Sequence, residues 1–94
     1  MTNQINLTHC VEPLTAKEKE RLRWKQLGEK YRNTRLALGI TLTELAKKTG
    51  CSDKTLSKLE FGRKLLWRSV MEKCYVNSLK LIMAERQAIL DQNL

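Results

Sequence analysis

The sequence has little of what membrane-spanning, secreted or disulfide-stabilised proteins contain. Its 94 residues include one proline and three cysteines, and no apolar run approaches the ~20 residues that span a bilayer. The opening residues, MTNQINLTHCVEPL, lack the basic start and apolar stretch of a signal peptide. We therefore expect a cytoplasmic protein that makes no contact with a membrane.

Residues suited to catalysis or metal binding are also scarce. Cys10, Cys51 and Cys74 are odd in number, lie far apart and lack C-x-x-C spacing, so they predict neither a disulfide framework nor a zinc site. His9 is the only imidazole. Because no nucleophile, base or metal cluster can be assembled, we expect no enzyme activity, no cofactor and no metal. Aromatic residues make up 5% of the chain, which disfavours RNA recognition by base stacking.

Positive charge is abundant and concentrated in one region. The chain has 18 Lys and Arg against 10 Asp and Glu, a net charge of +8. Residues 47–73 hold eight basic and three acidic residues, a net charge of +5, whereas residues 74–94 hold two of each and are neutral. This distribution indicates an anionic partner, and nucleic acid is the usual one.

The pattern along the chain predicts one all-α domain. Residues 1–14 show no helical period and are expected to form a flexible arm, with a single domain over 15–94. Thr15 and Glu18 form a capping-box pair, so a helix should begin near Ala16 and run towards Leu38. It is either one helix or two helices broken near Gly28, because a glycine inside a helix costs about 1 kcal/mol.

Residues 41–62, TLTELAKKTGCSDKTLSKLEFG, predict two short amphipathic helices, from about 42 to 48 and from about 53 to 61. Gly50 suits a left-handed turn between them. Thr41 and Glu44 form a capping-box pair for the first helix, and Ser52 is the N-cap of the second. This is a helix-turn-helix whose second helix, the recognition helix, is available to enter a DNA groove.

A further helical segment follows the motif. Ser69 and Glu72 are a plausible third helix start, and apolar residues then recur at intervals of three and four over 69–92, as one helix or two. The whole chain is expected to form about five helices, in a compact arrangement with an extended C-terminal helix. Trp24 and Trp67 are expected to be packed in the interior.

Five sequence segments resemble the Cro/cI-type helix-turn-helix family, also called the XRE family. They are LGEK (27–30), RLALGIT (35–41), ELA (44–46), TGCS (49–52) and LSKLEFGR (56–63). Leu42 replaces the glutamine that usually contacts a phosphate there, and KLLWRSVMEK replaces a proline-containing segment. The resemblance implies a compact lambda-repressor-like helical domain. Members of the family are typically small repressors, often from phages, plasmids or other mobile elements, that bind operators as dimers.

The resemblance assigns roles to residues of the motif. Asp53, Lys54 and Lys58 occupy the family's base-reading positions, although each lysine could instead meet phosphate and Asp53 could instead offset the helix dipole. Glu60 is expected to face away from DNA and to form an ion pair with Arg35. The residues expected at phosphates are Thr41, Thr43, Ser52, Thr55, Ser57, Arg63 and Lys64.

Dimerisation is expected through the C-terminal helix, about 69–92. The alternative is that this helix packs on its own domain, and the two roles are compatible. The candidate interface residues form an apolar stripe: Leu79, Ile82, Met83, Arg86, Ile89 and Leu90. The leading interpretation is therefore a dimeric repressor that acts on an inverted-repeat operator in double-stranded DNA. The alternative is an antitoxin that binds a toxin partner and also regulates its own operon.

Overall fold

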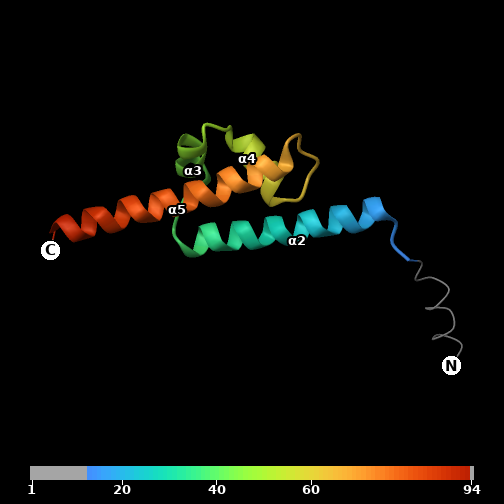
Figure 1. Ribbon diagram of the computed structural model, residues 1–94, viewed down its shortest axis with the longest axis horizontal. Helices are drawn as coiled ribbons and strands as arrows, with labels where there is room; N and C mark the ends of the chain where they lie inside the picture. Colours follow the sequence, from blue (N-terminus) through green and yellow to red (C-terminus); the bar gives the residue numbers. More distant parts are fainter. Residues whose placement is uncertain (1–12, 94) are drawn as a thin grey trace, which may run out of the picture.

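A computed structural model describes residues 13–93, which contain four helices and no strand (Figure 1). The helices are α2 (Ala16–Ala37), α3 (Leu42–Thr49), α4 (Asp53–Glu60) and α5 (Arg68–Asn93). The all-α prediction is confirmed. The expected five helices become four in this range, because the two segments that were predicted as either one helix or two each form a single helix. Of the predicted N-terminal arm, residues 1–12 lie outside the described residues.

The predicted capping box begins α2. The Glu18 amide donates to Thr15 Oγ1 at 3.1 Å, and the Thr15 amide donates to Glu18 Oε1 at 3.0 Å. Gly28 does not break the helix because it lies where α2 crosses α4. A Cβ atom at this position would stand 2.4 Å from the carbonyl oxygen of Glu60. The glycine therefore allows the two backbones to approach closely.

The helix-turn-helix forms as its local signals predict. Gly50 ends α3 with φ 78°, in the left-handed region, and Ser52 Oγ accepts the Thr55 amide at the start of α4. Thr41 Oγ1 likewise accepts the Glu44 amide at 3.0 Å. The second half of that predicted capping box is corrected: the Glu44 carboxylate accepts two hydrogen bonds from Arg86 of α5 instead.

The start of α5 differs from the prediction. The helix begins at Arg68 rather than after Ser69, and Glu72 forms an ion pair with Arg68 at 3.3 Å. Trp67, just before the helix, has φ 58° and an exposed fraction of 76%, so the expected packing of this side chain is wrong. Trp24 is half-buried, with the Arg68 guanidinium over its ring.

The hydrophobic core lies where α3 and α4 pack on the two long helices. Its members are apolar side chains from α3, α4, α5 and the turn between α2 and α3: Ile40, Leu45, Ala46, Leu56, Leu59, Tyr75, Leu79 and Ile82. Cys51 is half-buried against this cluster. The core thereby fixes the angle at which α4 is presented to solvent.

None of the helices in residues 13–93 is long and apolar enough to cross a membrane.

Candidate nucleic-acid interface

The two faces of α4 have different chemistry. Leu56, Leu59 and Glu60 are buried against the rest of the domain. Because a helix turns every 3.6 residues, the remaining positions form one outward face. Asp53 and Lys54 are exposed on it, and Lys58 is half-buried. The predicted base-reading residues therefore share one surface of the recognition helix.

A buried ion pair holds α4 in place. Arg35 Nε donates to Glu60 Oε2 at 2.7 Å, and Arg35 Nη2 donates to Glu60 Oε1 at 3.1 Å. The hydroxyl of Tyr75 also donates to the Glu60 carboxylate. The predicted Arg35–Glu60 pair is confirmed and joins α2 to α4. The Tyr75 hydroxyl joins α5 to the same carboxylate. Glu60 faces away from the outward surface, where its charge would repel phosphate.

This network shifts the protonation of both its partners. Hydrogen bonding to Glu60 raises the pKa of Arg35. Burial, followed by the hydrogen bond to Glu60, raises the pKa of Tyr75. Both residues therefore keep their protons, and their donated hydrogen bonds, at neutral pH. The buried carboxylate is matched by donors on two other helices, as a buried charge requires.

The side chains at the start of α4 are already engaged with one another. Ser52 Oγ lies 2.9 Å from Thr55 Oγ1, and Thr43 Oγ1 donates to Asp53 Oδ2 at 3.1 Å. The second bond links the start of α3 to the start of α4. Sequence reasoning did not anticipate it, because the two residues are ten positions apart. It gives Asp53 a role in joining the two helices, which is neither the base reading nor the dipole interaction expected from the sequence.

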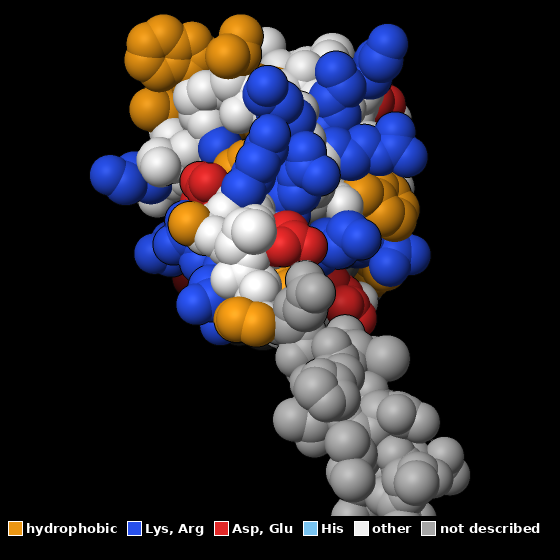
Figure 2. All heavy atoms as spheres, turned by 90° about the vertical axis from the view of Figure 1, so that its right-hand side faces the viewer, with side chains coloured by type: hydrophobic (Ala, Val, Ile, Leu, Met, Phe, Trp, Pro, Cys, Tyr) orange, Lys and Arg blue, Asp and Glu red, His pale blue; other side chains and the backbone are white. Residues whose placement is uncertain are grey.

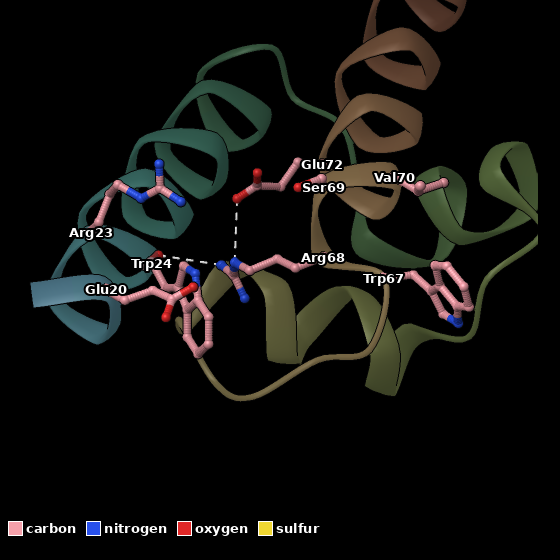
Figure 3. A pocket seen from close by; sticks show the side chains of 8 residues that line it. All are labelled: Glu20, Arg23, Trp24, Trp67, Arg68, Ser69, Val70 and Glu72. Carbon is pink, nitrogen blue, oxygen red and sulfur yellow. Dashed lines mark hydrogen bonds and ion pairs between the residues drawn. The ribbon is translucent and has the colours of Figure 1, made fainter. Parts of the chain in front are cut away.

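The loop after α4 presents two exposed cationic side chains, Arg63 and Lys64. Arg68 holds this loop: its guanidinium donates to the carbonyl oxygens of Arg63 at 3.0 Å, Leu59 at 2.9 Å and Trp24 at 3.3 Å. In Figure 3, Arg68 points between Trp24 and Glu72, while Trp67 points away from them. The sequence indicated Arg68 only as one more basic residue, because its partners are carbonyl groups distant in sequence.

Two further residues of the outward surface were missed. Phe61 follows α4 and is 52% exposed, and the Arg32 guanidinium of α2 lies 5.4 Å from the centre of its ring. The aromatic residue type was visible in LSKLEFGR, but its exposure depends on how α2 passes the end of α4. Arg32 thus adds a cation from α2 to the surface of the motif.

The predicted dimer stripe divides into two groups. Leu79 and Ile82 are buried in the core of the domain, so the prediction that they belong to the dimer interface is corrected. Arg86 is half-buried and bound within the domain, to the Glu44 carboxylate and to the carbonyl oxygen of Leu38. The other three candidates, Met83, Ile89 and Leu90, face solvent with exposed fractions of 37%, 58% and 58%.

Metal chemistry has no support in this part of the chain. Across residues 13–93, no group of three or more His, Cys, Asp and Glu side chains is placed to hold a metal ion.

Comparison with known proteins identifies the motif. Residues 32–66 match a family model described as helix-turn-helix. The matched range contains α3, α4, the end of α2 and the basic loop. Searches of curated proteins and of solved structures found no match. With the outward face of α4 and the two helix caps, the match shows a helix-turn-helix over residues 32–66, which supports a DNA-binding transcription regulator.

Proposed function

We propose that the protein is a repressor that binds an inverted-repeat operator as a dimer, with α4 in the major groove. The observation that carries this proposal is the division of α4: its core contacts and the Glu60 network lie on one face, and Lys54 and Lys58 lie on the other. A helix held in this way presents side chains to base edges without reorganising. Repression would follow from occlusion of the polymerase.

The two lysines are the proposed base readers. Each can donate to guanine O6 or N7, and a good contact of this kind contributes about 1–3 kcal/mol of discrimination. Asp53 has a different role here: its hydrogen bond with Thr43 keeps the starts of α3 and α4 together. Ser57 is half-buried on α4 and stays a proposed phosphate contact.

The proposed phosphate contacts surround this face. The hydroxyl of Thr41 accepts a backbone amide, which leaves its own proton free to point towards an anion. Ser52 and Thr55 share one hydrogen bond between their hydroxyls, so one of these two protons also stays free. The other proposed contacts are Thr43, Thr55, Arg63 and Lys64. Such contacts fix the position of the protein on DNA but carry no sequence information.

The projecting end of α5 is the proposed dimer contact. Figure 1 shows this end extending past the other three helices. It bears Ile89 and Leu90, and it continues from an apolar groove of about 460 Å³ between α2 and α5. Tyr31, Leu38 and Met83 are among the residues lining this groove. A second copy would cover both features and would place two copies of α4 one turn of DNA apart, about 34–36 Å.

DNase I footprinting on the DNA upstream of the gene, with excess competitor DNA and varied salt, tests the proposal. We expect a protected site with two-fold symmetry that persists in the presence of competitor. Protection that competitor abolishes would leave a DNA-binding protein without a specific operator, and the repressor proposal would be wrong.

Three single variants separate base reading from phosphate binding. Lys54→Ala should lower specificity at one operator position, whereas Arg63→Ala should weaken binding to all sequences and reduce the salt slope by about 0.9. Lys47→Ala is the matched control, because this exposed lysine of α3 lines a groove against α5. If Lys54→Ala and Arg63→Ala weaken all sequences equally, the assignment of Lys54 fails.

A second candidate function is an antitoxin that binds a toxin and controls its own operon. The observation in its favour is an apolar surface beside the motif, where Leu66, Trp67 and Val70 are 78%, 76% and 52% exposed. Exposed apolar clusters of this kind commonly bind proteins. Co-expression with the neighbouring reading frame should then yield a stable complex that Trp67→Ser disrupts, and copurification unaffected by this change would exclude this surface.

A further inference from the structure

A groove whose lining includes five cationic side chains lies beside the helix-turn-helix, between the N-terminal half of α2 and the loop after α4. It has a volume of about 820 Å³. Lys17, Arg21 and Lys25 line it from α2, and Arg63 and Lys64 line it from the loop. Figure 2 faces this end of the molecule and shows Lys and Arg side chains gathered on it. We call these five residues the basic groove.

The two walls of the basic groove are fixed relative to each other. Gly62 has φ 67°, and a Cβ atom there would stand 2.6 Å from the Cα atom of Lys25, so the loop backbone lies directly against α2. Arg68 also connects the walls, because it donates to the carbonyl oxygens of Arg63 and Trp24. The cations of the loop are thus held beside those of the helix.

The stripe on α2 follows from helical spacing. Lys17, Arg21 and Lys25 recur every four residues, which places their side chains on one face of a helix. All three side chains are exposed. The other three cations of this stretch, Lys19, Arg23 and Lys30, fall on a different face by the same spacing and do not line the groove.

The charge of the groove is unbalanced. The residues that line it include five cations and two carboxylates, Glu18 and Glu20, a net charge of +3. The Glu18 carboxylate is held at the helix start, where it accepts the Thr15 amide. Cations that lie close together repel one another unless an anion lies between them. The groove is therefore complementary to a row of negative charges.

We propose that the basic groove binds the phosphate backbone of the same DNA duplex that α4 reads, beyond the base pairs that α4 contacts. This inference rests on the proposed function for the orientation of α4. Arg63 and Lys64 immediately follow the recognition helix, so a backbone that meets them continues along the stripe on α2. The stripe precedes residue 32, where the match to the family model begins. The contact thus extends the interface outside the helix-turn-helix.

The test compares two triple variants with equal loss of charge. Lys17→Gln/Arg21→Gln/Lys25→Gln removes the stripe, and Lys19→Gln/Arg23→Gln/Lys30→Gln removes three exposed cations from the other face of α2. Affinity for a non-specific duplex of about 30 base pairs is measured from 50 to 200 mM salt. Circular dichroism confirms that both variants remain folded.

The stripe variant should bind roughly tenfold or more weakly at about 100 mM salt, and the magnitude of its slope of log K against log salt should fall by about 2–3. The control should lower the slope by less than about 1. Hydroxyl-radical footprints of the stripe variant should lose protection of one backbone segment while keeping protection at the bases that α4 reads. Equal slope changes in the two variants, or a wild-type slope near zero, would overturn the inference.

Failure of the inference is distinguishable from failure of the proposed function. An operator footprint that resists competitor, combined with equal slopes for the two variants, removes the basic groove from the interface and leaves the repressor in place. A footprint that competitor abolishes, combined with the expected difference in slope, removes the operator and leaves the groove as a DNA contact.

Discussion

Each of the two long helices has a part that is packed within the domain and an end whose side chains are mostly exposed. The middle of the molecule contains the core and the Arg35–Glu60 pair. The first half of α2 and the last turns of α5 are almost entirely exposed. All these segments are helical, so helix formation alone does not show what stabilises a segment. Tertiary burial stabilises the segments in the middle, and a bound partner is expected to stabilise the two ends.

The two projecting ends also differ from each other. Residues 13–25 hold five basic and two acidic residues, a net charge of +3. Residues 84–93 hold one basic and two acidic residues, a net charge of −1, with Ile89 and Leu90 exposed. The first composition suits a polyanion, and the second suits an apolar protein surface. The side chains thus suit the start of α2 to DNA and the end of α5 to a protein partner.

Glu60→Ala should have the largest effect on stability, because it breaks the middle of the molecule. The substitution leaves Arg35 buried without its partner, which costs about 3–5 kcal/mol of unfolding free energy. Urea unfolding followed by circular dichroism measures the loss. The control is Glu85→Ala, which breaks the exposed Lys48–Glu85 pair and should cost less than about 1 kcal/mol. Similar losses would show that the buried network does not hold the domain.

Tyr75→Phe should cost about 1.5–3 kcal/mol, because it removes a hydrogen bond to the charged Glu60. The substitution should also change how steeply the free energy of unfolding falls at alkaline pH. The pKa of Tyr75 is raised in the folded state, so its contribution is complete below the unfolded value of 10.0 and is lost as pH rises above it. Urea unfolding between pH 8 and pH 11 should show a shallower decline in the variant. An unchanged decline would place the pH dependence elsewhere.

Gly28→Ala should cost about 1–3 kcal/mol by overpacking, because its Cβ would meet backbone atoms of α4. Gly50→Ala is the matched comparison: no atom lies within 4 Å of its Cβ, and φ 78° alone should cost about 1 kcal/mol. The displaced α4 of the first variant should also lower DNA affinity, as fluorescence anisotropy would measure. Equal DNA affinity of the two variants would argue against close packing at Gly28 as the control of α4.

Ile89→Ser/Leu90→Ser should have the smallest effect on the isolated domain, within about 0.5 kcal/mol, because both side chains are exposed. Its effect should instead be on assembly. Sedimentation equilibrium should show a dimer for the wild type and a monomer for the variant, while Gln87→Ser/Gln92→Ser on the same helix end keeps the dimer. A dimer that survives the first substitution would move the interface away from the end of α5.

Local signals in the sequence were sufficient for the helix-turn-helix. Thr41 and Ser52 cap their helices within three residues, and Gly50 supplies the left-handed turn. These interactions depend on neighbours in the chain, so the pattern identifies them directly. The Arg35–Glu60 pair spans 25 residues, and it was predicted from the family resemblance rather than from spacing.

Long-range contacts account for the errors. The Glu44 carboxylate has a local partner in its capping box, yet Arg86, 42 residues away, binds it instead. Trp67 has a large aromatic side chain of the kind usually found in a core, but the loop that Arg68 holds turns it towards solvent. Neither outcome is visible in a local pattern, because each depends on which distant group lies nearby.

By itself, the sequence determined the all-helical class, the recognition helix and the excess of positive charge around it, because periodicity, caps and composition are local properties. Only the tertiary structure decided which apolar residues of α5 enter the core. Leu79 and Ile82 are buried in the core that α3, α4 and α5 share, whereas Ile89 and Leu90 are exposed. The apolar stripe runs along α5 without a break, but α3 and α4 cover only part of it. How much they cover is set by the packing of helices that are distant in sequence.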